Sequence, residues 1–461
     1  MARKQVKLNN GTKKDCELNA MDADRFSELP DYIIHKILSF LPTIDAVRMS
    51  LLSKRWRRMW YSLPALNFDD SAIVGDFNAK RFSKVVGNCL KLRKADMLAV
   101  DGDNAISKFR LATAKMWRWS SINGWLSLVS KSKVKELDLH VSSRSKTSFC
   151  LPPSILRIES LTCLRLANVE VEDVDSASLP SLTSLSLEKV KLSDQVLCDL
   201  VSRCCSLERL VLKLCHGLSN PKVSSWSVKF LEIAYTEFTI SKMFHVEVGA
   251  VNLESFKCSG PYVSLDNLNL SLCATLRSLS FSCLSFDDQW LEDQILRLPL
   301  LECLTLRHCV KLERVRICSQ RLKCLAFEGN GLFFAAEPTI DCPNLVYFSY
   351  EGYLSSNSTM TLGKNLLEAK IKCLNPAAYD TEWYMNLIEF FSNLNCPNNM
   401  SLDVCSEEAL IFPYTFRKHV RSPLLTVKHM KVRTGTPSLG NPDLRDAINW
   451  LVPSLKTLSI E

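Results

Sequence analysis

The hydrophobic positions of this chain repeat in one local pattern from residue 134 onward. A triplet, apolar-x-x-apolar-x-apolar, begins at Val134, Leu161, Leu182, Leu207, Val228, Leu253, Leu276, Leu301, Leu322, Leu345 and Leu366. Because alternate side chains of a strand point to the same face, each triplet predicts one short strand with one buried face. Starts that lie 21 to 27 residues apart predict a solenoid, in which each unit buries its apolar side against the next.

The segments between these strands differ from unit to unit. After Ser193, a possible N-cap, one helical face is shared by Val196, Leu197, Leu200 and Val201, and residues 287–298 show the same pattern. The unit that starts at Leu301 instead contains a second triplet ending at Ile317, which predicts an extended outer segment. After residue 371 the period is less regular, with a helical pattern over 383–394 and triplets ending at Val432 and Ile460. We therefore expect an irregular solenoid.

The chain before the repeats has the periodicity of helices. Ile33, Ile37 and Leu41 recur at four-residue intervals, which predicts a helix that opens near Pro30, with Ser27 as a possible cap, and ends before residue 42. Two shorter helices are expected over 43–49, capped by Thr43, and over 53–61. Three short helices make a core near the lower size limit for independent folding, so this module should need a partner.

Composition and charge exclude several classes of function. The apolar content of 47% supports a large core, and the net charge of +8 is small for 461 residues. No apolar run is long enough to span a membrane, and no phosphate-binding glycine motif occurs among the 14 glycines. The 19 cysteines are odd in number and include no C-x-x-C pair, which indicates reduced thiols in the cytoplasm or the nucleus. We expect no cofactor, no metal, no nucleic acid and no membrane association.

Catalysis by this chain is not expected. No G-x-S-x-G elbow, no H-E-x-x-H helix and no other metal-ligand spacing occurs in the sequence, so no catalytic residues are assigned.

The N-terminal module carries a resemblance to a known family. Two Leu-Pro pairs, at 29–30 and 41–42, precede the run Ser53-Lys-Arg-Trp-Arg57, and this combination resembles an F-box. The chain as a whole is similar to plant F-box/leucine-rich-repeat proteins. The resemblance implies a non-catalytic substrate receptor that docks on a Skp-type adaptor and through it on a cullin and a RING subunit. The adaptor-binding positions that it implies are Leu29, Pro30, Ile33, Ile34, Ile37, Leu38, Leu41, Pro42, Ser53, Trp56 and Trp60.

The predicted fold class is α+β with repeats, a three-helix F-box followed by an irregular α/β leucine-rich-repeat solenoid. The expected boundaries are a basic leader over 1–21, the box over 22–66, a connecting segment and N-terminal cap over 67–133, and the solenoid over 134–461 with divergent C-terminal repeats.

The substrate is expected on the concave face, where stacked repeats usually present a binding surface. Candidate substrate-binding residues are the outward positions of the strands, Arg165, Arg209, Lys213, Glu232, Lys257, Arg307, Tyr347 and Lys370. These positions are mixed in charge, whereas a nucleic-acid groove requires a continuous basic stripe. An unknown protein substrate is therefore favoured. The alternative that the sequence leaves open is a leucine-rich-repeat scaffold with a non-degradative role.

Overall fold

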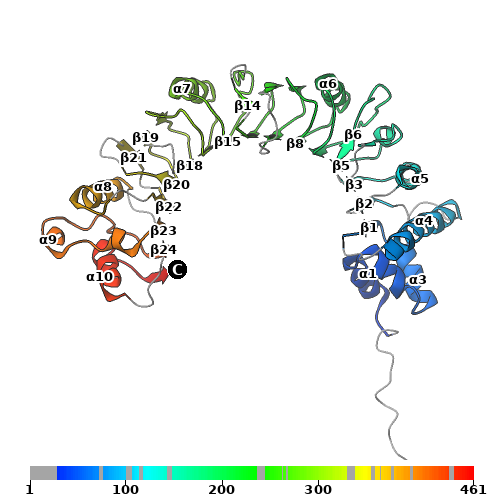
Figure 1. Ribbon diagram of the computed structural model, residues 1–461, viewed down its shortest axis with the longest axis horizontal. Coiled ribbons are helices and arrows are strands. Elements are labelled where there is room, and N and C mark those ends of the chain that lie inside the picture. Colours follow the sequence, from blue (N-terminus) through cyan, green and yellow to red (C-terminus); the bar gives the residue numbers. More distant parts are fainter. Residues whose placement is uncertain are drawn as a thin grey trace, which may run out of the picture.

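The computed structural model shows an open arc, with the three N-terminal helices at one end and the last helix at the other (Figure 1). The structure describes residues 28–71, 76–99, 106–113, 118–142, 148–235, 244–261, 263–265, 268–329, 338–354, 359–363, 365–374, 378–394, 398–435 and 441–461. One row of strands lines the concave side of the arc, and helices and short strands form its convex side.

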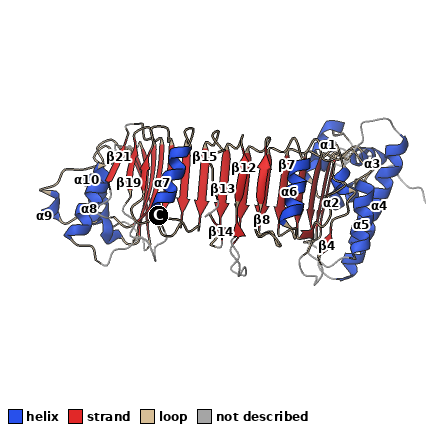
Figure 2. Cartoon of the chain, turned by 90° about the horizontal axis from the view of Figure 1, so that it is seen from above, coloured by secondary structure: helices blue, strands red, loops and turns tan. Residues whose placement is uncertain are grey.

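The concave side is a single 16-stranded sheet in which neighbouring strands are parallel. Figure 2 shows these strands side by side along the length of the molecule. In sheet order the strands are β1 (Ala65–Asp69), β2 (Lys108–Ala112), β3 (Glu136–His140), β5 (Cys163–Ala167), β7 (Ser184–Glu188), β8 (Arg209–Lys213), β10 (Phe230–Ala234), β13 (Ser255–Ser259), β15 (Ser278–Ser282), β16 (Cys303–Arg307), β18 (Cys324–Glu328), β20 (Tyr347–Gly352), β22 (Glu368–Cys373), β23 (Asn399–Val404), β24 (His429–Thr434) and β25 (Thr457–Ile460).

The convex side carries different elements in successive repeats. Its helices are α4 (Asp76–Ala99), α5 (Trp119–Val129), α6 (Asp194–Arg203), α7 (Asp288–Arg297), α8 (Thr381–Ser392), α9 (Tyr414–Arg417) and α10 (Pro442–Leu451), with 3-10 turns at Ile155–Arg157 and Glu407–Leu410. Its short parallel strands are β4 (Phe149–Cys150), β6 (Val169–Glu170), β9 (Lys222–Ser225), β11 (Phe244–His245), β12 (Glu247–Ala250), β14 (Val263–Ser264), β17 (Arg316–Cys318), β19 (Thr339–Cys342) and β21 (Thr359–Leu362).

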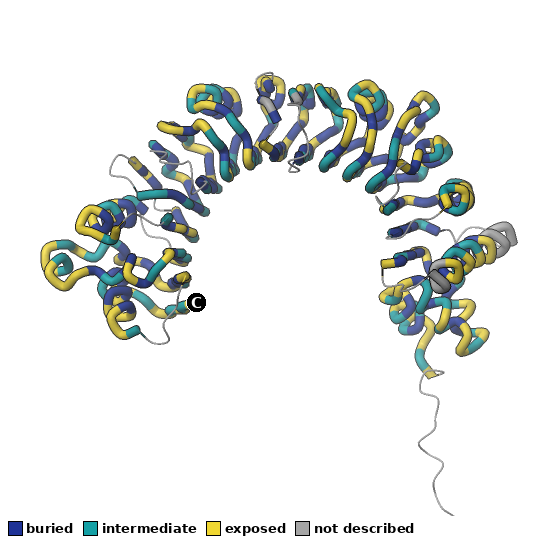
Figure 3. Tube along the Cα trace, viewed as in Figure 1, coloured by how far each residue is buried: buried dark blue, intermediate teal, exposed yellow. Residues whose placement is uncertain are grey.

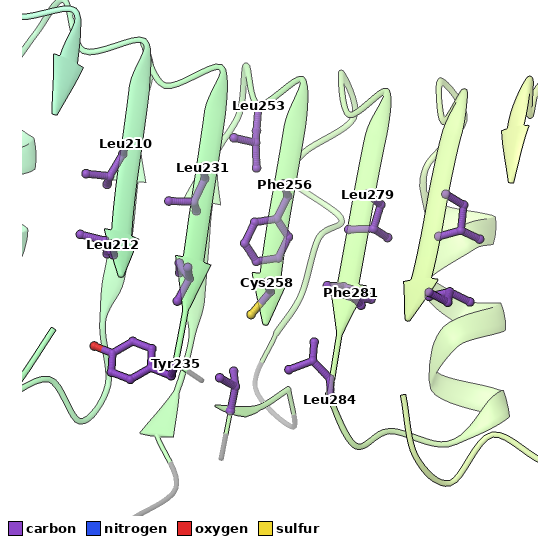
Figure 4. Packing of buried hydrophobic residues seen from close by; sticks show 14 of the residues in the cluster. Leu210, Leu212, Leu231, Tyr235, Leu253, Phe256, Cys258, Leu279, Phe281 and Leu284 are labelled. Carbon is purple, nitrogen blue, oxygen red and sulfur yellow. The ribbon is translucent and has the colours of Figure 1, made fainter. Parts of the chain in front are cut away.

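The hydrophobic core runs continuously between the concave sheet and the convex elements (Figure 3). Equivalent residues of successive strands stack on one another in rows, and Figure 4 shows one row that runs through Leu210, Leu231, Phe256 and Leu279. All four side chains are fully buried. Because each repeat buries its apolar positions only against its neighbours, the stack rather than the single repeat is the stable unit.

The predicted repeat architecture is confirmed, and so is the fold class. The hydroxyl of Ser193 accepts the N–H of Val196 at 3.3 Å and caps α6, while α7 occupies the second predicted helix. The second triplet of the unit that starts at Leu301 forms β17, as expected for an extended outer segment. The divergent C-terminal triplets form β24 and β25 of the same sheet.

The sheet begins earlier than the sequence predicted. β1 and β2 lie in or next to the segment 67–133, which was expected to connect the box to the solenoid and cap it. The triplets that begin at Leu63 and Ile106 are present in the sequence, but α4 lies between them and breaks the period. Two details of the prediction, Ser27 as a helix cap and the leader over 1–21, lie outside the described residues.

Several free cysteines are buried in the hydrophobic core, where their thiols are unreactive. Burial raises the pKa of the Cys215, Cys258 and Cys309 thiols to about 12. The thiols of Cys215 and Cys309 donate hydrogen bonds to the carbonyl oxygens of Leu187 and Phe281, at 3.5 and 3.7 Å. These two cysteines therefore close the turn after their strands.

The same burial predicts a pattern of thiol labelling. A thiol with a pKa near 12 is thiolate in about one molecule in ten thousand at pH 8, and only the thiolate reacts. We expect a short iodoacetamide pulse on the native protein to label the exposed Cys318 and Cys405 and to leave Cys258 and Cys309 unmodified in a peptide mass map. In denaturant all four should react, and fast native labelling of Cys258 would contradict this packing.

Candidate functional site

The N-terminal module is built from α1 (Asp31–Phe40), α2 (Thr43–Met49) and α3 (Lys54–Tyr61), which contact one another. Four of the implied adaptor-binding residues form its interior, since Ile34, Leu38, Trp56 and Trp60 are at most 2% exposed. A partner cannot reach these side chains while the module is folded. Their role is to support the surface, and the direct contacts must come from other residues.

The remaining implied positions are accessible. Pro30 and Pro42 are exposed, and Leu29, Ile33, Ile37, Leu41 and Ser53 are half-buried. The hydroxyl of Ser53 accepts the backbone N–H of Trp56 at 3.2 Å, so this residue caps α3. Thr43 does not cap α2 with its side chain as predicted, because its hydroxyl accepts the N–H of Asn67 instead, at 2.6 Å.

The structure adds apolar surface that the sequence pattern did not reveal. Tyr32, Phe40, Leu51 and Leu52 are 72, 77, 75 and 59% exposed. Tyr32 and Phe40 lie off the apolar face of the first predicted helix, and Leu51 and Leu52 lie between the second and the third, so helical periodicity predicted no role for them. An apolar residue at a predicted exposed position is nevertheless a signal of a binding surface. Large exposed side chains gathered on so small a module mark a protein-interaction site.

An ion pair fixes how the chain enters this module. Arg55 donates from Nε to the Asp31 carboxylate at 2.6 Å, and its second arm donates to the carbonyl of Leu29. The guanidinium thus ties the first turn of α1 to α3 and holds the Leu29–Pro30 segment against the module.

The module is joined to the solenoid by buried contacts. Arg93, at 1% exposed, comes from α4 and donates to the carbonyl oxygen of Trp60 at 3.3 Å and to that of Leu63. These carbonyls lie at the C-terminal end of α3, where backbone acceptors are left without intrahelical partners and cations are favoured. Together with the Thr43–Asn67 bond, this contact makes the module continuous with β1.

The eight candidate substrate-binding residues lie on the concave strands, as predicted, but they do not form one site. Arg209, Lys213, Glu232 and Lys257 form one cluster on β8, β10 and β13. Tyr347 and Lys370 form a second cluster on β20 and β22. Arg165 on β5 and Arg307 on β16 lie apart from both.

Neighbouring strands neutralise much of the concave charge. Lys213 contacts the Glu232 carboxylate at 2.8 Å, and Arg209 lies 4.0 Å from the same group. Arg307 pairs with Glu328 at 2.8 Å in the same way. Charges of mixed sign that are already paired do not form the continuous basic stripe that a phosphate backbone requires.

Basic side chains lie over aromatic rings in both clusters. The guanidinium carbon of Arg209 lies 3.6 Å from the centre of the Phe230 ring, and the Lys257 ammonium lies 5.7 Å from the same ring. In the second cluster, Lys370 lies 5.2 Å from the Tyr347 ring. The sequence analysis did not predict Phe230 as a site residue, although it stands two residues after its triplet start, as Arg209 and Tyr347 do.

Other chemistry is not indicated within the part of the chain that the structure describes. No group of three or more His, Cys, Asp or Glu side chains there could hold a metal ion. No helix of that part is both long and apolar enough to cross a membrane.

Two models of protein families match the chain. The F-box domain matches residues 26–67, which contain α1 to α3. The model described as "FBD-associated F-box protein At5g56370, LRR repeats" matches residues 122–267, which begin within α5 and extend past β14.

Proteins of Arabidopsis thaliana are similar to this chain over part of its length. The F-box/LRR-repeat protein At1g55660 is 34% identical over 253 residues, covering 48% of this chain and 67% of that protein. The F-box/FBD/LRR-repeat protein At5g56420 is 35% identical over 202 residues, or 43% of this chain and 46% of that protein. The chain thus spans about half to two thirds of these relatives. With an F-box at one end and leucine-rich repeats over the rest, the chain belongs to the plant F-box/leucine-rich-repeat family.

Proposed function

We propose that this chain is the substrate-recognition subunit of an SCF-type cullin–RING ubiquitin ligase. Its F-box docks on a Skp-type adaptor, which connects it to the cullin and the RING subunit, and its repeats bind a protein substrate. The chain contributes no catalytic group. It acts by holding the substrate near the ubiquitin-carrying enzyme, which raises the effective concentration of the substrate lysine. This role belongs to the cytoplasm or the nucleus, where thiols stay reduced.

The observation that carries the proposal is the apolar surface of the F-box. Tyr32, Phe40, Leu51 and Leu52 are exposed on a module of three short helices, whose own core is made by other residues. Burial of large apolar side chains against a partner is the main source of free energy in such interfaces. The coarser function, a non-catalytic adaptor with an F-box and leucine-rich repeats, follows from the family.

The burial of Trp56 decides which variants can test the adaptor contact. Replacing Trp56 would unfold the module, so that lost binding would carry no information on the interface. Phe40→Asp together with Leu51→Asp places charges on exposed positions and leaves the core intact. A charge that must be buried without a partner in the interface is strongly destabilising, and we expect the affinity for a Skp-type adaptor to fall by roughly 100-fold or more.

The measurement is co-purification of the full chain with a Skp-type adaptor, followed by titration calorimetry. Leu296→Asp is the matched control, because Leu296 is 79% exposed on α7, far along the arc from the box. The control should bind as the unmodified chain does. If the unmodified chain does not bind the adaptor, the ligase role is wrong. If the double variant still binds fully, the contact lies elsewhere on the box.

A further inference from the structure

A hollow of about 460 Å³ lies at the rim of the solenoid, where the strands of the concave sheet begin. It runs across the starts of β7, β8, β10, β13 and β15 and includes Trp226, Glu208, Lys229, Asn252 and Glu254 among its lining residues. Trp226 is 81% exposed, which is more than any other large hydrophobic side chain in the described part of the chain.

The bend that carries Trp226, between β9 and β10, is held by its own hydrogen bonds. The Asn252 amide donates to the carbonyl oxygen of Trp226 at 2.7 Å, and the hydroxyl of Ser225 accepts the N–H of Ser227 at 3.2 Å. The backbone is therefore fixed while the indole is left in solvent. Such a preorganised aromatic group loses little entropy when it binds a partner.

The fold itself does not require an aromatic residue at this position. Gln320 occupies the equivalent place in a later repeat, where Asn344 donates to its carbonyl oxygen at 2.8 Å in the same way. Trp226 stands two residues before the first apolar residue of its triplet, and in the other ten repeats that place is never aromatic. The hydrogen bond from the asparagine amide thus explains the backbone conformation at this position. The exposed indole has no packing role that would explain why a tryptophan stands there.

The charges of the hollow are not balanced. Lys229 pairs with Glu208 at 2.7 Å. Glu254, the third charged group of the lining, has no basic group within ion-pair distance among the described residues. The two carboxylates and one ammonium give the hollow a formal charge of −1, whereas the whole chain carries +8. Arg277, at the start of the next strand, pairs with Glu302 at 2.5 Å, so Glu254 is the carboxylate of this lining that stays available to a cation.

We propose that this hollow binds an arginine or lysine side chain of a partner protein, with the cation on the face of the Trp226 indole and in contact with the Glu254 carboxylate. Tryptophan is the best aromatic partner for a cation, and a carboxylate beside it adds charge. The hollow lies next to the Arg209–Phe230 cluster of the concave face, since Glu208 and Lys229 of its lining directly precede those residues. A protein segment can therefore follow both. The assignment of this partner as the ligase substrate rests on the proposed function.

The test is selection of random displayed peptides on the purified full chain, held in complex with the adaptor where that complex forms. We expect arginine or lysine to be enriched at one position of the selected peptides. For a resynthesised peptide, fluorescence polarisation should show about tenfold weaker binding to Trp226→Ala and to Glu254→Gln. Glu254→Lys should lose the peptide and bind the version in which glutamate replaces the basic residue.

Two matched controls separate the hollow from general surface effects. Tyr414→Ala removes another exposed ring, and Glu247→Gln removes an exposed carboxylate on β12. Both should bind the peptide as the unmodified chain does. Failure to select any peptide, selection of acidic peptides, or equal loss in the controls would overturn the proposal.

Adaptor binding by the same variants distinguishes this proposal from the proposed function. Trp226→Ala and Glu254→Gln should keep full affinity for the adaptor, because both positions lie on the solenoid away from the box. A chain that selects basic peptides but never binds the adaptor would retain the hollow as a binding site and reject the ligase role. A chain that binds the adaptor but selects no basic peptide would reject the hollow as a binding site for a basic side chain and leave the ligase role standing.

Discussion

Phe281→Ala is expected to lower the free energy of unfolding by about 3–5 kcal/mol, as large-to-small changes of a buried phenylalanine do. Phe281 is fully buried in β15. Its ring lies 6.0 Å from that of Phe256 in the preceding strand and 5.5 and 5.8 Å from those of Phe286 and Trp290. The loss is large because this ring joins the concave sheet to the segment that leads into α7.

Guanidinium unfolding followed by far-UV circular dichroism measures this loss. Leu296→Ala is the control, since Leu296 is 79% exposed on α7 and its truncation should change stability by no more than about 0.5 kcal/mol. Because repeats stabilise one another only through their neighbours, the variant should also broaden the transition or divide it in two. A stability equal to that of the control would show that the aromatic contacts around Phe281 contribute little.

The repeats were predictable because one physical requirement, an inward apolar row, recurs in every unit. The same requirement holds for β1 and β2, whose triplets begin at Leu63 and Ile106. β1 was missed because the 24-residue helix α4 separates its triplet from that of β2, and a regular period does not continue across an insertion of that length. The triplet of β2 begins about one repeat before Val134 and was predictable from its spacing. β23 was missed for a different reason, since the position three residues before Met400 is Pro397 and not an aliphatic residue.

The candidate site was predictable as a region and not residue by residue. The sequence pattern locates the apolar face of α1, but it cannot separate Ile34, which is fully buried, from the neighbouring Ile33, which is half-buried. That difference depends on how α3 packs against α1. Likewise the sequence places Trp226 outside the triplet, but it does not give the extent of its exposure, which follows from the bend that Asn252 holds from the next repeat.

The contact between the box and the solenoid connects the two proposed binding sites. A ligase receptor has to present its substrate at a defined position relative to the adaptor, and a flexible connection would let the substrate take a range of positions. In this chain Arg93 fixes the position of the box relative to the solenoid. Its guanidinium lies in the interior, and it reaches the C-terminal end of α3 from α4, an element of the solenoid.

Arg93→Met is therefore expected to loosen the box while it leaves the solenoid folded. Methionine keeps most of the apolar stem but removes the donors, so the carbonyl oxygen of Leu63 loses the guanidinium, and that of Trp60 still accepts the backbone N–H of Leu63. Hydrogen bonds to a charged group contribute about 1.5–3 kcal/mol each, so we expect local stability to fall by roughly 3 kcal/mol. Hydrogen exchange measured by mass spectrometry should show faster exchange of the α3 amides and unchanged exchange in β8 to β16.

Arg57→Met on the exposed side of α3 is the control for charge, and it should leave exchange in α3 unchanged. Arg93→Lys tests geometry, because a single ammonium does not reproduce a guanidinium that spans two carbonyl oxygens, and it should recover only part of the protection. Equal exchange in Arg93→Met and the unmodified chain would show that the box holds itself together without the solenoid. A box that exchanges faster should in turn bind the adaptor more weakly, since part of the binding free energy is then needed to refold it.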